Sequence, residues 1–111
     1  MIKGIGTDIE STERFKESYN DDHFIHLIFT EREKKYCLEK AEPWISFAGK
    51  FCAKEAVIKA SHEKLGMKDI EIVNEANGKL SVYLKGVKSD NIKCSISHTQ
   101  EYAMAFALWE E

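Results

Sequence analysis

Hydrophobic positions along this chain change from the period of a strand to that of a helix and back again. Over residues 2–9, apolar residues alternate with polar residues or glycine, which predicts a β-strand. Residues 44–65 are apolar around most of a helical circumference and predict one long helix. Pro43 suits the first position of that helix, and Gly66 suits its end.

Three shorter helices are expected between the strand and the long helix, over residues 12–16, 24–28 and 30–40. Ser11 or Thr12 is expected to cap the first of them. Thr30 and Glu33 have the spacing of a capping box, in which each side chain bonds the backbone N–H of the other residue. The third helix is therefore expected to begin at Thr30.

The second half of the chain returns to the period of strands. Apolar and polar residues alternate on both sides of Asn77-Gly78, which is a strong signal for a β-hairpin. Two further strands are expected over residues 92–98 and 102–109. We therefore predict a single α+β domain over residues 1–111. It has an antiparallel sheet that the first strand rejoins, a long central helix and shorter helices.

The last predicted strand has two very different faces. One face carries large apolar side chains, and the other carries Ala103, Ala105 and Ala107. A row of alanines lets another backbone approach closely. The long helix is apolar on two faces, which is more than so small a chain easily buries. The two apolar faces of the helix are interpreted as a hint of packing between subunits.

Composition narrows the class of protein. A net charge of −3 and a pI near 5.8 argue against a general nucleic-acid binder. The cysteines have no metal-binding spacing and are interpreted as reduced core thiols. No apolar stretch is long enough to span a membrane, and no leader sequence opens the chain. We expect a soluble, cytoplasmic protein that binds neither nucleic acid nor membrane.

Asp8 and Glu55 are the strongest candidates for chemistry. Asp8 lies at the end of the first strand on the same face as two glycines, and Glu55 lies within the apolar long helix. Because burying an unpaired carboxylate is costly, such groups are usually paired, protonated or bound to a cation. If the fold brings the two together, they offer the oxygen ligands that Mg²⁺ prefers. The nearby cations Lys50, Lys54 and Lys59 indicate a phosphate as the partner of the metal.

Each of these residues also has a simpler explanation. Asp8 can be a turn or capping residue, and Glu55 with Lys59 can form an ordinary ion pair one helical turn apart. His98 shares a strand face with apolar residues, so a hydrogen-bonded core histidine is the default interpretation. The alternative is a donor to a phosphate oxygen. The other histidines are expected on the surface: His23, His26 and His62.

Several motifs occur in an order that is specific in combination. Residues 4–9 (Gly-Ile-Gly-Thr-Asp-Ile) are followed by Arg14, and residues 51–56 (Phe-Cys-Ala-Lys-Glu-Ala) by Lys59-Ala60. Further motifs stand at Phe29-Thr30 with Glu33, Asp69 to Ile72, Asn77 to Lys79 and Ser95 to Thr99. Together they resemble the bacterial holo-(acyl-carrier-protein) synthases, the small class of 4′-phosphopantetheinyl transferases, over nearly the whole chain.

The resemblance implies a transferase reaction. The 4′-phosphopantetheine arm of coenzyme A moves to a serine of apo acyl carrier protein, and adenosine 3′,5′-bisphosphate is released. Asp8 and Glu55 are implied to bind the Mg²⁺ that holds the coenzyme A pyrophosphate, with a base near them accepting the serine proton. Lys59 is implied to support the leaving bisphosphate as a cation or proton donor.

The resemblance also implies binding roles and an assembly. Lys50, Lys54 and His98 match positions near the nucleotide phosphates. Arg14 matches a residue that docks the acidic carrier protein. The family forms homotrimers with sites at the subunit interfaces, which would account for the two apolar faces of the long helix and for the row of alanines.

The chain departs from the family at two places. Leu80 stands where the family often has proline, and residues 61–66 are shorter than the family's glycine-rich turn. The way the 3′-phosphate and adenine are held therefore does not transfer. Two alternatives to the transferase are a non-catalytic trimeric module that binds a coenzyme or nucleotide, and a structural assembly domain in which Glu55 and Lys59 form a packed ion pair.

Overall fold

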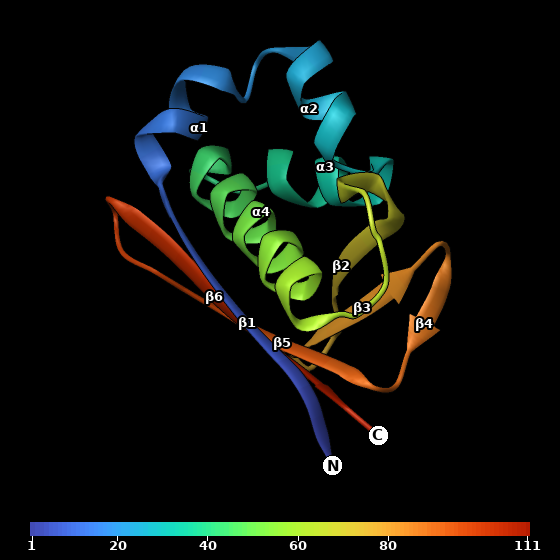
Figure 1. Cartoon of the computed structure of the whole chain (residues 1–111). Helices are drawn as coiled ribbons and strands as arrows, with labels where there is room; N and C mark the ends of the chain where they lie inside the picture. The colour runs from blue at the N-terminus through green and yellow to red at the C-terminus, as the bar shows by residue number, and fades with distance from the viewer.

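A long helix, α4 (Pro43–Ala60), lies at the centre of the computed structural model, which describes all 111 residues. One side of α4 packs against a three-stranded antiparallel sheet in the order β1-β6-β5 (Figure 1). The strands of this sheet are β1 (Ile2–Ser11), β5 (Ile92–His98) and β6 (Tyr102–Glu110). The first strand therefore rejoins the last two, as predicted.

The remaining elements surround the other sides of α4. Three short helices lie toward its N-terminal end (Figure 1): α1 (Thr12–Ser18), α2 (Asp22–Ile28) and α3 (Glu31–Leu38). A 3-10 turn, η1 (Met67–Asp69), leads into a second antiparallel sheet, which consists of β2 (Ile70–Asn74), β3 (Leu80–Leu84) and β4 (Val87–Ser89). The prediction of one sheet was wrong in this respect, because the strands form two.

Small residues allow β1 and β6 to approach α4 closely. Ala103, Ala105 and Ala107 of β6 are fully buried. A Cβ atom on Gly4 or Gly6 of β1 would lie 2.0 Å from a backbone oxygen of α4. The close approach that these residues predicted is therefore real, but the approaching backbone is α4 of the same chain. The interpretation of the alanine row as a subunit contact was wrong.

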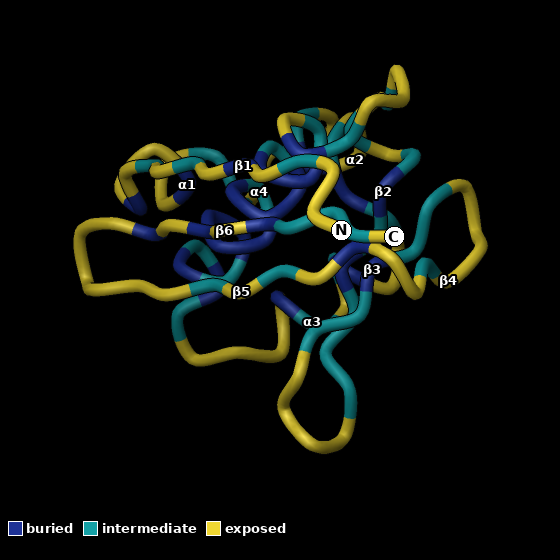
Figure 2. The backbone as a smooth tube through the Cα atoms, turned by 60° about the horizontal axis from the view of Figure 1, so that its bottom comes forward, coloured by how far each residue is buried: buried dark blue, intermediate teal, exposed yellow.

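The core follows α4. It is one cluster of 18 buried residues, which includes the fully buried rings of Phe15, Phe29 and Phe47. Figure 2 shows buried segments along α4 and the facing part of β6, whereas the connecting loops are exposed. The chain itself covers one apolar face of α4 completely, whereas the stripe of Trp44, Phe51 and Ile58 is only partly buried.

The end of α4 and the cap of α1 differ from the prediction. Helix α4 ends at Ala60 rather than near residue 65, because Ser61 is extended (ψ 149°) and its hydroxyl accepts a hydrogen bond from the Glu63 N–H. Neither Ser11 nor Thr12 caps α1 with its side chain. The Thr12 hydroxyl instead donates to the Gln100 carbonyl at 2.6 Å, which ties α1 to the β5–β6 turn.

Two turn predictions are confirmed. The Thr30 hydroxyl accepts from the Glu33 N–H, and the Glu33 carboxylate accepts from the Thr30 N–H, so the capping box of α3 is present. The β2–β3 hairpin turns through Gly78, which has a φ of +85° that favours glycine.

Strand β4 was not predicted; it follows Lys85 and Gly86, both at positive φ. No helix is both long and apolar enough to cross a membrane.

Candidate functional site

Asp8 faces α4 from the edge strand β1. Its Oδ1 lies 3.5 Å from the Nζ of Lys59, which also donates to the Thr7 carbonyl at 2.8 Å. Its Oδ2 is the one buried side-chain oxygen or nitrogen that has no hydrogen-bond partner. Buried polar atoms are nearly always paired, so a buried oxygen without a partner indicates a site for a further ligand, such as a cation. Asp8 is therefore not an ordinary turn or capping residue.

Glu55 lies on the open side of α4. Trp44, Phe51 and Ile58 on the same stripe are also only partly buried, so the expectation of a deeply buried Glu55 was wrong. The Glu55–Lys59 ion pair, which was the simpler alternative to a metal site, is not formed, because Lys59 pairs with Asp8. The Glu55 carboxylate is thus free to bind a ligand.

Asp8 lies beside the helical turn that contains Glu55. Its neighbours on α4 are Lys59, which it contacts, and Cys52. Burial, and next the negative charge of Asp8, raise the pKa of the Cys52 thiol to about 12. Cys52 and Lys59 are two helical turns apart, and Glu55 lies between them. The oxygen ligands of the two carboxylates fit Mg²⁺ chemically.

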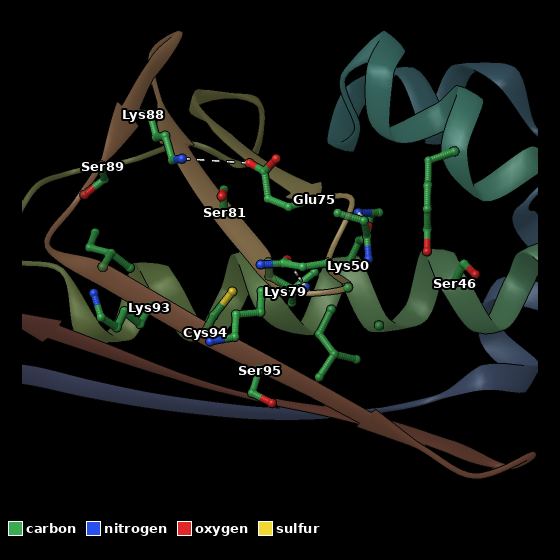
Figure 3. A pocket seen from close by; sticks show the side chains of 18 of the residues that line it. Ser46, Lys50, Glu75, Lys79, Ser81, Lys88, Ser89, Lys93, Cys94 and Ser95 are labelled. Atoms are coloured by element: carbon green, nitrogen blue, oxygen red, sulfur yellow. Dashed lines mark hydrogen bonds and ion pairs between the residues drawn. The ribbon is translucent and has the colours of Figure 1, made fainter.

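A large hollow lies on another side of α4 (Figure 3). It has a volume of about 820 Å³ between α4, the β2–β3 hairpin and β5. Four lysines line it and only two acidic residues do: Lys50, Lys79, Lys88 and Lys93, with Glu75 and Asp90. This excess of positive charge suits a phosphorylated ligand.

Lys50 forms part of the wall of this cavity although it is almost completely buried. Its Nζ donates to the Ile72 carbonyl at 2.8 Å and to the Asn74 Oδ1 at 2.6 Å. Burial lowers the pKa of its ammonium group. Since an ammonium group has three N–H donors, one remains for a ligand.

Lys54 does not fit the predicted contact with a nucleotide phosphate. Its side chain has no exposed surface, and its Nζ lies 2.6 Å from the Glu33 carboxylate. It also donates to three backbone carbonyls: those of Ile28, Met67 and Ile70. Four acceptors leave none of its three N–H groups for a ligand.

His98 and Arg14 are both accessible. His98 is exposed at the end of β5 and lines the large cavity, so the default interpretation as a core histidine was wrong. Arg14 of α1 has a side chain that is 52% exposed, is paired with Glu10 and lies over the ring of Phe51. The other three histidines are on the surface, as predicted.

Sequence reasoning missed two groups of residues. Glu33 was noted only as half of a capping box, although it also pairs with Lys54 across 21 positions of sequence. The sequence did offer a signal for this pair: Glu33 was expected at the start of a helix, and Lys54 lies on an apolar helix, so each charge needed a partner. Lys79, Lys88 and Lys93 come from the hairpin, β4 and β5, and nothing in their spacing indicated a shared cavity.

The two groups of candidate residues open onto different hollows of the single chain. Lys50 and His98 line the large cavity, and none of Asp8, Glu55 and Lys59 does. Asp8 and Lys59 instead line a smaller hollow of about 370 Å³, together with Thr7, Ile9 and Met104. No single hollow of one chain therefore contains all the predicted site residues.

Comparison with known proteins identifies the family. The model of the 4′-phosphopantetheinyl transferase superfamily matches residues 4–107. The chain belongs to this superfamily. Its relatives include holo-(acyl-carrier-protein) synthases from Chlamydia pneumoniae, 42% identical with 94% of this chain and 93% of the relative covered, and from Thermodesulfovibrio yellowstonii, 39% identical with 97% and 98% covered. The resemblance drawn from the motifs is confirmed.

Solved structures of the superfamily have the same fold. The holo-(acyl-carrier-protein) synthase of Neisseria meningitidis matches with a TM-score of 0.85 at 27% identity, with 100% of both chains covered. That of Bacillus anthracis, solved in complex with coenzyme A (3′,5′-ADP), matches with a TM-score of 0.84 at 31% identity, with 100% of this chain and 98% of the other covered. The predicted α+β class with antiparallel strands and a long helix is confirmed.

Proposed function

We propose that this enzyme transfers the 4′-phosphopantetheine arm of coenzyme A to a serine of apo acyl carrier protein and releases adenosine 3′,5′-bisphosphate. Relatives at about 40% identity over the full chain are holo-(acyl-carrier-protein) synthases. The observation that carries the proposal is the contact of Asp8 in β1 with Lys59 in α4, one helical turn from Glu55, because all three are motif residues.

Asp8 and Glu55 are the proposed ligands of a magnesium ion. The unpartnered Oδ2 of Asp8 and the unpaired carboxylate of Glu55 support this assignment. A magnesium ion held by these residues would neutralise negative charge on the pyrophosphate as the phosphoanhydride bond breaks. The serine oxygen attacks the phosphorus atom that bears pantetheine, and the bond to the bridging oxygen breaks. A carboxylate of this pair accepts the serine proton, and Lys59 supports the leaving bisphosphate.

The lysine-lined cavity is the proposed site for the nucleotide part of coenzyme A. The third N–H of Lys50 and the exposed ring of His98 are available as phosphate donors there. Lys79 replaces Lys54 in this role, because it lines the cavity and forms no ion pair. Arg14, exposed on α1, is the proposed contact for the acidic carrier protein.

A homotrimer with sites at the subunit interfaces is the proposed assembly. Asp8 and Lys59 line one hollow of the single chain and the lysines line another, so we propose that the coenzyme A binds between two copies that each contribute one of these hollows. The outward face of the β1-β6-β5 sheet supports such packing, because it exposes large apolar residues: Ile5, Ile9, Tyr102, Met104 and Phe106. A patch of this kind is typical of a protein interface.

The deciding experiment is a measurement of carrier mass. Purified enzyme is incubated with apo acyl carrier protein, coenzyme A and Mg²⁺, and the carrier is examined by intact mass spectrometry. We expect an added phosphopantetheine group on one serine, and none when the enzyme is omitted. An unchanged carrier mass together with heat of coenzyme A binding in calorimetry would instead identify a non-catalytic binding module.

A further inference from the structure

Strand β2 has a free edge that is bonded by side chains instead of a strand. It pairs with β3 on one side only, because it is the first strand of the sheet β2-β3-β4. On the other side, the Ile70 carbonyl accepts from Lys54 at 2.7 Å and the Ile72 carbonyl accepts from Lys50 at 2.8 Å. The Ile72 N–H donates to Glu33 at 2.7 Å. Three side chains therefore take the place of a neighbouring strand.

Glu33 and Lys54 form the buried centre of this arrangement. Their charged groups are 2.6 Å apart, and neither side chain has exposed surface. Glu33 also holds the start of α3 through the Thr30 N–H at 2.9 Å. Lys54 also bonds the carbonyls of Ile28 and Met67, which lie at the end of α2 and in η1. The pair thus connects α2, α3, η1 and β2 to α4.

A buried ion pair is a poor means of stabilising a core, because desolvation offsets much of the attraction and apolar residues of similar size often serve as well. Its directional bonds, in contrast, allow only one placement of the groups that it joins. Here the joined group is β2, which fixes where the hairpin stands relative to α4. The position of the hairpin matters because its turn, residues 75–79, forms one wall of the large cavity.

We propose that Glu33 and Lys54 are positioning residues for coenzyme binding: they hold the β2–β3 hairpin at the distance from α4 that the coenzyme cavity requires. This inference rests on the proposed function of the cavity. Lys50 belongs to both structures, since it bonds Ile72 and Asn74 of β2 and also faces the cavity. A displaced β2 would therefore move the hairpin wall and the Lys50 ammonium together.

The test separates affinity for coenzyme A from turnover. In Lys54→Met the bonds to β2 are lost, and in the milder Glu33→Gln the carboxylate becomes neutral with its shape kept. For Lys54→Met we expect the KM for coenzyme A to rise about tenfold. This rise corresponds to a hairpin that stands in the binding position in roughly one molecule in ten. The KM for carrier protein and the kcat at saturating coenzyme A should stay within about twofold. Glu33→Gln should give a smaller rise of the same kind.

The matched control is Lys34→Met, which removes the neighbouring lysine of α3 that pairs only with the exposed Asp22. It should leave all three kinetic constants unchanged. A purely structural role of the pair would lower the fraction of folded enzyme, and hence the apparent kcat, without changing the KM for coenzyme A. An unchanged KM for coenzyme A in a folded variant would overturn the proposal.

A measurement on the unmodified protein covers the case in which Lys54→Met does not fold. Amide hydrogen exchange should show the Ile72 N–H as slow as the amides of β2 that bond β3, and addition of coenzyme A should slow the hairpin amides further. Rapid exchange at Ile72 would overturn the proposed anchor. Absence of carrier modification by the unmodified enzyme would instead refute the proposed function, so the two failures are distinct.

Discussion

At the scale of single residues, the decisive feature is that Lys59 contacts Asp8 and leaves Glu55 without a partner. We expect Glu55→Gln to lower the transfer rate by on the order of 100-fold or more, because the amide keeps the shape but loses the negative charge of a proposed metal ligand. Thermal stability should hardly change, since the Glu55 side chain makes no bond within the chain. Initial rates of carrier modification and a melting curve measure the two effects.

The matched control for this variant is Glu63→Gln, an exposed glutamate just beyond the end of α4. Its rate and melting temperature should equal those of the unmodified enzyme. Turnover at the original rate in Glu55→Gln would remove Glu55 from the site. A large loss of stability in the same variant would show that Glu55 has a structural role instead.

The sequence identified site residues where a motif carried them and failed where a long-range contact decided their environment. Asp8, Glu55 and Lys59 were selected together, and the fold brings Asp8 to Lys59 from 51 positions away. Lys54 was placed in the same group because it is a cation beside Glu55. Its direction on α4 and its partner Glu33 could not be seen from helical spacing alone, so its predicted role was wrong.

At the scale of elements, the contact of β1 with α4 depends on the absence of side chains at two glycines. A Cβ on Gly6 would lie 2.0 Å from the Ala56 oxygen and 2.9 Å from the Lys59 Cβ, and neither backbone can easily move. We expect Gly6→Ala to lower the free energy of unfolding by about 3 kcal/mol, the upper part of the range for overpacking. Chemical denaturation followed by circular dichroism measures this change.

Gly66→Ala serves as the comparison for this substitution. The nearest atom to its added Cβ is the Asp69 Oδ2 at 3.4 Å, which is an ordinary contact, and its φ is negative. Its unfolding free energy should stay within about 1 kcal/mol of the original value. Equal effects of the two substitutions would mean that β1 can move away from α4 without cost.

The sequence predicted helices and turns well where the residues that determine them lie close together in the sequence. The Thr30–Glu33 capping box and the Asn77-Gly78 turn are contained within a few residues, and both are present. The end of α4 was misplaced because the Ser61 hydroxyl offers the backbone an alternative bond, which a hydrophobic pattern does not register. Strand β4 was missed because it has only three residues.

At the scale of the whole molecule, the sequence could not show which face of β6 lies inside. Large apolar residues normally fill a core, yet Tyr102, Met104 and Phe106 point outward while the alanines are buried. The reason is geometric: α4 lies so close to the sheet that only alanine and glycine fit between them. The larger side chains are therefore left on the surface, where they form an apolar face together with Ile5 and Ile9.

This exposed face allows the proposed assembly to be tested. Phe106→Glu places a charge on the β6 strand of the face, at a side chain that is 39% exposed in the single chain, so the fold should survive. If a second copy covers Phe106, the buried charge would disrupt that contact at a cost of several kcal/mol. Light scattering coupled to size exclusion should give about three times the chain mass of 12.8 kDa for the unmodified protein and a single-chain mass for Phe106→Glu.

Transfer activity should fall together with the assembly if the proposed trimer brings Asp8 of one copy to the lysine-lined cavity of another, because the two belong to different hollows of the single chain. Val87→Glu is the matched control: Val87 is 70% exposed on β4, outside the β1-β6-β5 sheet, so both mass and activity should be retained. A Phe106→Glu protein that is a single chain and still modifies the carrier at the original rate would show that each chain contains a complete site. In that case the cavity and the carboxylates would have to be bridged by one coenzyme across α4, and the trimer would not be required for catalysis.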